Sequence, residues 1–164
     1  MKLLMGLALA ATAAPQQYAP AAPRLQRIEM KTTTWGHPLV SWTIDAEGNG
    51  RLTLPDPDPF KATQMVTRSF AVGTAGFRRI RVLIGIAEQR APGNLHCTVA
   101  ATDAPSGTVR WVPSHGRTAS LSFYTACSEF SARSVVAQLD KAEALIEEWA
   151  KAGPVVEVVP VARQ

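Results

Sequence analysis

The amino-acid sequence predicts an α+β domain, in which an antiparallel sheet of about six or seven strands carries one long C-terminal helix and a second helix on one face. Short segments with alternating apolar and polar residues recur through most of the chain, as in half-buried strands. Near the C-terminus, apolar residues recur instead at spacings of three and four, as on one face of an α-helix. Turn-forming residues separate most of these segments.

The N-terminal residues precede this pattern. Residues 1–13 have the three parts of a secretory signal peptide: a lysine, the apolar run LLMGLALAA, and the small-x-small sequence Ala11-Thr12-Ala13. The apolar run is much shorter than the ~20 residues of a membrane span, so we expect cleavage after Ala13 and no permanent membrane anchor. Residues 14–23 are rich in proline and alanine and should link the cleavage site to a single domain, residues 24–164. The protein is therefore predicted to be exported, either to the periplasm or as a secreted protein.

Three strands are predicted in the first part of this domain. Ile28–Thr32 and Val40–Ile44 alternate, so that their even-numbered side chains face inward. Gly48-Asn49-Gly50 is a strong turn signal, and a third strand begins after it at Leu52. The second and third strands should therefore form a hairpin.

A proline-rich run and a fourth strand follow. Pro55–Pro59 is expected to end all regular structure, because proline lacks a backbone N–H. The fourth strand is predicted over Val66–Val72. Arg68 falls on the same face as Val66 and Phe70, so its guanidinium should reach solvent or meet an acidic group.

The segment Phe77–Arg90 fits two patterns. Its apolar residues form a helical stripe, but those from Ile80 to Ile86 also alternate as in a strand. The β-branched residues and Gly85 favour a strand. The length of the segment and the lead-in Gly73–Gly76, with Thr74 as N-cap, favour a helix. We predict a helix and keep the strand as the alternative.

Three further strands and the long helix complete the domain. The strands are predicted at His96–Thr102, Thr108–Val112 and Ala119–Thr125, in an up-down-up meander. Gly153 is expected to take the left-handed conformation that ends a helix, and the valines after Pro154 are a candidate edge strand. The apolar stripe of the helix, with its last member expected to be buried against the sheet, consists of Val135, Leu139, Ala142, Ile146 and Trp149.

Cys97 and Cys127 are the only cysteines of the chain, so in an exported protein they should form a disulfide. The predicted meander opposes this, because it places them at opposite ends of their strands, whereas a disulfide needs Cα atoms within ~7 Å. We expect the disulfide to form. Either Pro113–Thr118 must then be a crossing connection, or the chain must bend sharply after Phe123.

Composition and motifs restrict the classes of function. The net charge of +4 comes from basic residues that are spread along the chain, and only 7% of residues are aromatic, which is unlike a nucleic-acid-binding domain. His37, His96 and His115 show no metal-ligand spacing. Asp45–Gly50 together with Asp56 resembles a calcium loop, but strands and prolines flank it, so we interpret it as a hairpin turn. We predict no cofactor and no metal site.

Two classes of function remain. The favoured one is a non-catalytic exported domain that binds an envelope protein, a lipid or a saccharide. The alternative is a small exported hydrolase whose site is assembled from distant residues, such as a serine with His115 and Asp103, although no nucleophile elbow supports it. The arginines near residue 80 suit lipid phosphates or acidic polysaccharide, but a solvated helix edge is the simpler interpretation. The candidates to line a ligand surface are Trp35, Tyr124, Arg78, Arg79 and Arg81.

Overall fold

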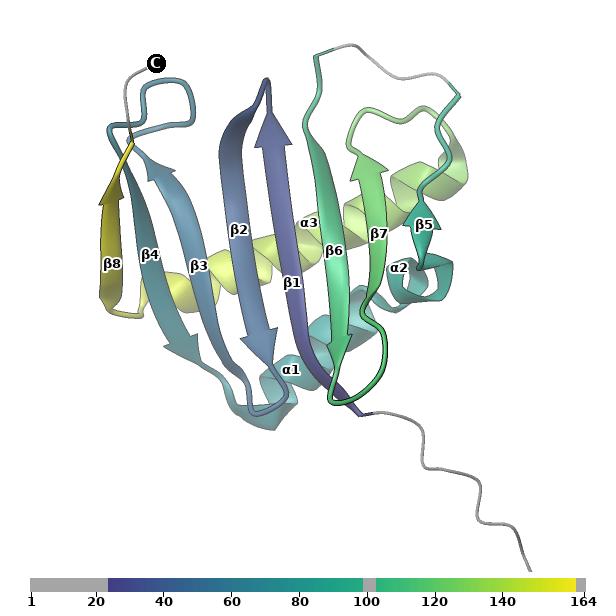
Figure 1. Ribbon diagram of the computed structural model, residues 1–164, viewed down its shortest axis with the longest axis horizontal. Coiled ribbons are helices and arrows are strands. Elements are labelled where there is room, and N and C mark those ends of the chain that lie inside the picture. The colour runs from purple at the N-terminus through teal and green to yellow at the C-terminus, as the bar shows by residue number, and fades with distance from the viewer. Residues whose placement is uncertain (1–23, 99–102, 162–164) are drawn as a thin grey trace, which may run out of the picture.

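The sheet has β1 (Leu25–Thr34) near its centre, and later strands extend it in both directions (Figure 1). The computed structural model describes residues 24–98 and 103–161. The strand order is β5-β7-β6-β1-β2-β3-β4-β8, and every neighbouring pair is antiparallel except β5 with β7. The other elements are β2 (His37–Asp45), β3 (Asn49–Asp56), β4 (Gln64–Ala71), α1 (Gly73–Leu83), α2 (Gly85–Arg90), β5 (Gly93–Asn94), β6 (Ser106–Pro113), β7 (Ala119–Tyr124), α3 (Phe130–Lys151) and β8 (Val155–Pro160).

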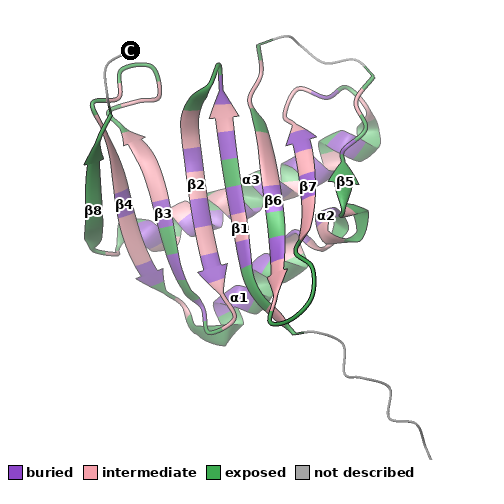
Figure 2. Ribbon diagram, in the orientation of Figure 1, coloured by how far each residue is buried: buried purple, intermediate pink, exposed green. Residues whose placement is uncertain are grey.

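The α+β prediction is confirmed. The described part of the chain forms eight strands, slightly more than predicted, and all three helices lie on one face of the sheet (Figure 1). The other face carries no described element. The buried apolar side chains lie between the sheet and the helices and form one core, whereas the edges and loops are exposed (Figure 2).

The first three strands follow the predicted alternation. Met30 on β1 pairs with Trp42 on β2, and Trp42 pairs with Leu52 on β3, so the three side chains form one buried row under the helices. The β2–β3 hairpin is confirmed. Its turn is closed by the Asp45 carboxylate, whose Oδ1 accepts a hydrogen bond from the Asn49 backbone N–H at 2.8 Å.

The prediction that Pro55 ends regular structure is wrong, because β3 continues through Asp56. The Val72 N–H donates to the Gly48 carbonyl at 2.9 Å, which shows that the even-numbered residues of β3 form the backbone hydrogen bonds to β4. Alternate residues direct these groups to opposite neighbours, so the backbone nitrogen of Pro55 faces β2. The β2–β3 ladder has already ended at Ser41 and Thr53. The missing N–H of Pro55 therefore removes no hydrogen bond from the sheet.

On β4, Arg68 is partly exposed and, among the described residues, forms no ion pair with an acidic group. Its Nη1 donates to the Gly153 carbonyl oxygen at 3.0 Å, just after α3 ends. Carbonyl groups at a helix C-terminus lack intrahelical donors and carry partial negative charge, so a guanidinium suits this position. The buried side of β4 is thereby tied to the end of the long helix.

The segment Phe77–Arg90 is helical, as predicted, but it breaks at Ile84 into α1 and α2. The predicted cap is wrong: Val72 is the N-cap residue, no side chain caps the helix, and Thr74 lies inside it. The Val72 N–H is held by the Gly48 carbonyl, which fixes where the chain leaves the sheet and the helix begins. The apolar stripe is buried as expected, at Phe77, Ile80, Ile84 and Ala87.

The long helix α3 buries the predicted stripe with one exception. Val135, Leu139, Ala142 and Ile146 are buried, but Trp149 is only half-buried. Its ring lies beside Phe70 of β4, with ring centroids 6.0 Å apart and a tilt of 45°. Trp149 therefore covers the margin of the sheet instead of its centre.

The predicted left-handed role of Gly153 is also wrong. The C-cap residue is Ala152, in a right-handed conformation, and Gly153 does not have a positive φ. A Cβ at Gly153 would instead overlap the Ser69 carbonyl oxygen of β4. Glycine is needed here because the chain leaving α3 passes directly over the backbone of β4. It then forms β8, which confirms the predicted edge strand.

The predicted strand His96–Thr102 is wrong over the residues that the structure describes. Leu95–Thr98 has no regular structure, and residues 99–102 lie outside the described part of the chain. The strand at this point is β5, which pairs in parallel with β7 through Gly93 with Leu121 and Asn94 with Ser122. Two parallel strands end at the same edge of a sheet, so the residues after β5 lie beside those after β7.

This parallel pairing explains the disulfide, which is confirmed. Cys97 follows β5, Cys127 follows β7, and their Cα atoms are 5.4 Å apart. The expected crossing connection does not occur, because β6 and β7 form a plain antiparallel hairpin in which Trp111 pairs with Ala119. The chain does turn directly after β7, at Thr125 and Ala126. The meander placed the cysteines apart only because it made residues around Cys97 an antiparallel strand.

No helix in the described ranges is long and apolar enough to cross a membrane.

Candidate functional site

The open face of the sheet is polar. Because side chains alternate along a strand, the partners of the buried core residues point away from the helices. Many of them are hydroxyl side chains, and Thr53 and Thr67 are joined across β3 and β4 by a hydrogen bond of 2.9 Å between their Oγ1 atoms. The other hydroxyl residues of this face include Thr33, Ser41, Thr43, Ser69, Thr108, Ser120 and Ser122.

An ion network lies on the same face. The Glu29 carboxylate of β1 pairs with Arg27 Nε at 2.6 Å and with Arg110 Nη1 of β6 at 3.0 Å. Both arginines are about half exposed, so solvent and salt screen these pairs. The network joins two strands, and Lys31 and Arg51 are further charged residues on the same face.

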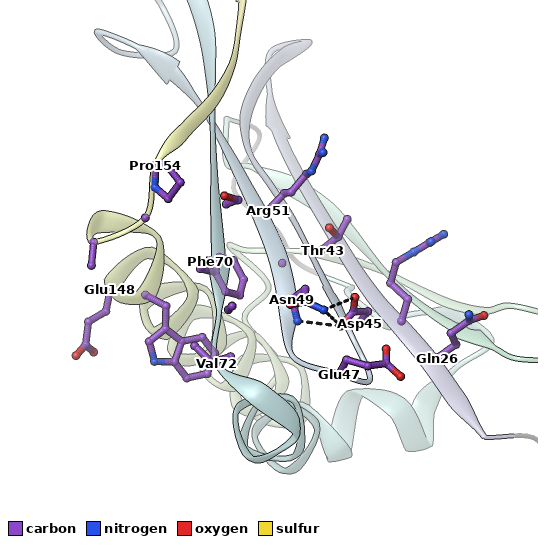
Figure 3. Close-up of a pocket in the computed structure, with 17 residues that line it drawn as sticks. Gln26, Thr43, Asp45, Glu47, Asn49, Arg51, Phe70, Val72, Glu148 and Pro154 are labelled. Carbon is purple, nitrogen blue, oxygen red and sulfur yellow. Dashed lines mark hydrogen bonds between the residues drawn. The ribbon is translucent and has the colours of Figure 1, made fainter.

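One corner of the sheet is hollowed. Past Arg68, the strand β4 no longer pairs with β8, and the Ser69 N–H donates instead to the carbonyl of Pro154 at 3.1 Å. The resulting hollow, called here the corner hollow, has a volume of about 870 Å³. Figure 3 shows its lining from β1, β2, β3 and β4 on one side and from the end of α3 on the other. The lining side chains include Gln26, Arg27, Thr43, Asp45, Glu47, Asn49, Arg51, Ser69, Phe70, Val72, Glu148 and Trp149.

The corner hollow mixes hydrogen-bond donors and acceptors. Asp45 is held in place by the backbone and side-chain amides of Asn49, as the dashed lines in Figure 3 show. Arg51 is exposed and, among the described residues, forms no ion pair. Glu47 and Glu148 are exposed carboxylates. Phe70 and Trp149 supply an aromatic wall behind these groups.

The sequence did not reveal this site. Asp45, Glu47 and Asn49 were recognised only as a turn, and Arg51 carried no signal at all. The site forms because the chain after α3 crosses β4 at Ser69 and brings the helix end beside the hairpin. No local pattern encodes that crossing.

The predicted ligand-surface residues are not brought together. Trp35 stands 69% exposed at the β1–β2 turn, with a φ of 50°. Tyr124, at the end of β7, accepts a hydrogen bond from the Ala104 N–H at 3.0 Å and so holds the loop before β6. Arg78 and Arg81 share a separate hollow on the outside of α1, and Arg79 is exposed beside them.

The residues named for a hydrolase also lie apart. Asp103 precedes β6 and His115 follows it, so the length of the strand separates them. His37 begins β2, where its ring packs edge-on against Phe60 at 5.8 Å, and His96 follows β5.

One further cluster surrounds the disulfide. Glu129 lies beside Cys127 and accepts hydrogen bonds from the Thr98 N–H, at 2.6 Å, and from the Thr98 hydroxyl. These bonds lower the pKa of Glu129 to about 2, because they stabilise the ionised carboxylate. The two sulfur atoms are bonded to each other, so this cluster offers no thiolate to a metal.

Comparisons of the chain with protein-family models, with curated proteins and with solved structures found no match. The interpretation of the corner hollow therefore depends on its own geometry.

Proposed function

We propose that this protein is a non-catalytic exported domain that binds a saccharide component of the cell envelope in the corner hollow. The observation that carries the proposal is the lining of the hollow, which combines hydrogen-bond donors and acceptors with the aromatic side chains of Phe70 and Trp149. Of the three partner classes considered from the sequence, a saccharide fits this lining best.

The charges of the hollow favour a neutral, polyhydroxylated ligand. The lining contains two arginines, Arg27 and Arg51, and three acidic residues, Asp45, Glu47 and Glu148, so neither sign dominates. Each sugar hydroxyl both donates and accepts, and it can pair with guanidinium, amide, hydroxyl and carboxylate groups at once. An anionic polymer would meet the carboxylates, and a purely apolar chain would leave the polar groups unpaired.

The chemistry of the lining supports binding without catalysis. No histidine or cysteine is among the residues that line the hollow. The Asp45 carboxylate is occupied by Asn49, in a contact that also closes the hairpin turn. Such a carboxylate stabilises the turn and can accept a hydrogen bond from a ligand hydroxyl, but it is poorly placed to act as a general acid or base.

Export is the second part of the proposal. The signal-peptide features of residues 1–13 support it, and the Cys97–Cys127 disulfide is typical of an oxidising compartment. We expect the mature protein to begin at Ala14. N-terminal sequencing that finds Met1 on the protein from whole cells would contradict export.

Calorimetric titration of the mature, oxidised protein tests the binding proposal. The probes are soluble peptidoglycan fragments and neutral gluco-oligosaccharides. Removing a charged hydrogen-bond partner costs ~1.5 to 3 kcal/mol, so Arg51→Gln and Glu47→Gln should each weaken binding about tenfold or more. Lys31→Gln, an exposed change on the same sheet face but outside the hollow, should leave the affinity unchanged.

Two results would contradict the proposal. No heat with either probe, or equal weakening by the hollow variants and by Lys31→Gln, would remove the hollow as a saccharide site. If chromatography detects shortened sugars after the titration, the result would favour the hydrolase instead.

A further inference from the structure

The outer side of α1 and α2 exposes apolar side chains where a surface helix should be polar. Val82 is 81% exposed and Ile86 is 41% exposed, although the core-facing stripe of the same helices is fully formed. Val82 follows Arg78 by four residues, so these two positions lie on the same side of α1. Ile86 lies beyond the break, on α2. Burial in this chain does not explain why Val82 and Ile86 are apolar.

Arginines surround these apolar residues. The two helices contain four arginines, at positions 78, 79, 81 and 90, and one acidic residue, Glu88, which gives a net charge of +3. Glu88 is paired with Arg81 at 3.3 Å. Arg78 and Arg79 are exposed and form no ion pair with any described residue. We call Arg78, Arg79, Arg81, Val82 and Ile86 the basic helical surface.

The basic helical surface contains a shallow depression. It has a volume of about 600 Å³ and lies at the break between the helices, lined by Arg78, Arg81, Val82 and Gly85 with Glu88 and Gln89. A Cβ at Gly85 would have no atom within 4 Å, so the floor of the depression is open. Guanidinium groups beside an open depression suit a phosphate-bearing headgroup.

We propose that the basic helical surface docks the protein on a bilayer that contains anionic lipids. A helical surface with arginines around exposed apolar side chains is the arrangement by which proteins lie at a membrane interface, where the cations meet phosphates and the apolar groups enter the acyl boundary. An acidic polysaccharide would satisfy the arginines but leave Val82 and Ile86 in water. The proposal goes beyond saccharide binding and uses a different surface.

The docked orientation has a consequence for the corner hollow. Val72 lines the hollow and Gly73 begins α1, so the hollow adjoins the N-terminal end of the helix that carries the basic helical surface. Docking through α1 would hold the hollow close to the membrane while leaving the polar sheet face free. A saccharide attached to, or lying next to, the membrane would then be within reach.

Vesicle co-sedimentation of the mature, oxidised protein tests the docking. We expect binding to vesicles of phosphatidylcholine with about one-third phosphatidylglycerol, much weaker binding to phosphatidylcholine alone, and loss of binding toward ~0.5 M salt. A basic residue near an anionic surface contributes roughly a fivefold change in affinity, so Arg78→Gln and Arg79→Gln should each weaken binding by about that factor. Val82→Ser should weaken it about threefold or more, because the apolar contact is lost.

Matched controls lie elsewhere on the molecule. Val156→Ser changes a valine that is 46% exposed on β8, and Lys31→Gln removes a cation from the open sheet face. Neither should change vesicle binding, and all five variants should keep the melting temperature of the parent protein.

Equal binding to neutral vesicles, or equal effects of control and test variants, would overturn the proposal. So would an unaltered affinity of Val82→Ser together with tight binding to a soluble acidic polysaccharide, which would indicate a polyanion partner. Saccharide binding at the corner hollow is measured separately, so failure of the docking leaves that proposal standing.

Discussion

The two faces of the sheet differ completely, although the same strands make both. On β2, Trp42 and Ile44 are almost completely buried under the helices, while Thr43 between them lies on the open face. The covered face is mainly apolar, and the open face carries hydroxyl groups and the Glu29 ion network. Strand alternation thus separates two tasks: one set of side chains holds the fold together, and the other remains available to a ligand.

The helical layer explains the difference. The stripe of α3 and the stripe of α1 and α2 bury the covered face, which gains the free energy of removing apolar surface from water. The open face gains no free energy of this kind, so polar residues there do not reduce the stability. Substitutions on the two faces should therefore differ in how much they lower the free energy of unfolding, and neighbouring positions provide the comparison.

The largest effect is expected at Ile44. Ile44→Ala would leave a cavity under the helices and should lower the free energy of unfolding by ~4 kcal/mol. Thr43→Ala, one residue away on the open face, should change it by less than ~0.5 kcal/mol. Urea unfolding of both variants measures the contrast. Similar losses would mean that the helices do not cover the face assigned to them.

The disulfide should contribute nearly as much, because it ties the start of α3 to the chain after β5. Its cysteines are separated by 30 residues, and closing a loop of that length stabilises a protein by ~3.5 kcal/mol in the chain-entropy model. The double variant Cys97→Ser with Cys127→Ser should unfold at correspondingly lower urea. Mass spectrometry of non-reduced peptides provides the control, and two free thiols in the exported protein would contradict the pairing.

Glu143 should make the helical layer sensitive to pH. Burial, together with the nearby charges of Glu147 and Asp140, raises its pKa from 4.5 to about 7. An acid with a raised pKa in the fold holds its proton more tightly when folded, so its ionisation is destabilising. The destabilisation is absent below pH 4.5, grows as the pH rises, and is complete above about pH 7.

Glu143→Gln should therefore stabilise the protein by up to ~3 kcal/mol at a pH of ~8 and remove this pH dependence. Glu148→Gln, an exposed change on the same helix, should do neither. Thermal unfolding of the parent protein and of both variants across this pH range measures the stabilisation and the pH dependence. A parent protein whose stability does not fall between pH 4.5 and 7 would show that Glu143 is better solvated than its position indicates.

The smallest effect is expected on the open face. Arg110→Gln removes one arm of the Glu29 network, but exposed ion pairs contribute only ~0.2 to 1 kcal/mol and are screened by salt. We expect a loss below ~0.5 kcal/mol that disappears at high salt. A larger, salt-resistant loss would show that the open face shares in holding the fold together.

Local patterns in the sequence were sufficient for much of the fold. The alternation of Ile28–Thr32 and Val40–Ile44 predicted the buried sides of β1 and β2, and the stripe from Val135 to Ile146 predicted the buried side of α3. The compartment inferred from the N-terminus predicted the disulfide, although the predicted strand order opposed it.

What the sequence by itself determined are the features that depend on neighbouring residues: strand alternation, helical spacing, turn signals and the presence of two cysteines. The tertiary structure alone decided the parallel placement of β5, the close passage of Gly153 over Ser69, the half-burial of Trp149 and the position of the corner hollow. Each of these depends on where a chain segment crosses another that is distant in sequence. Periodicity indicates which side of an element is buried, but it holds no information about where one strand continues past the end of its neighbour. The corner hollow forms at such a place, where β4 continues beyond its pairing with β8.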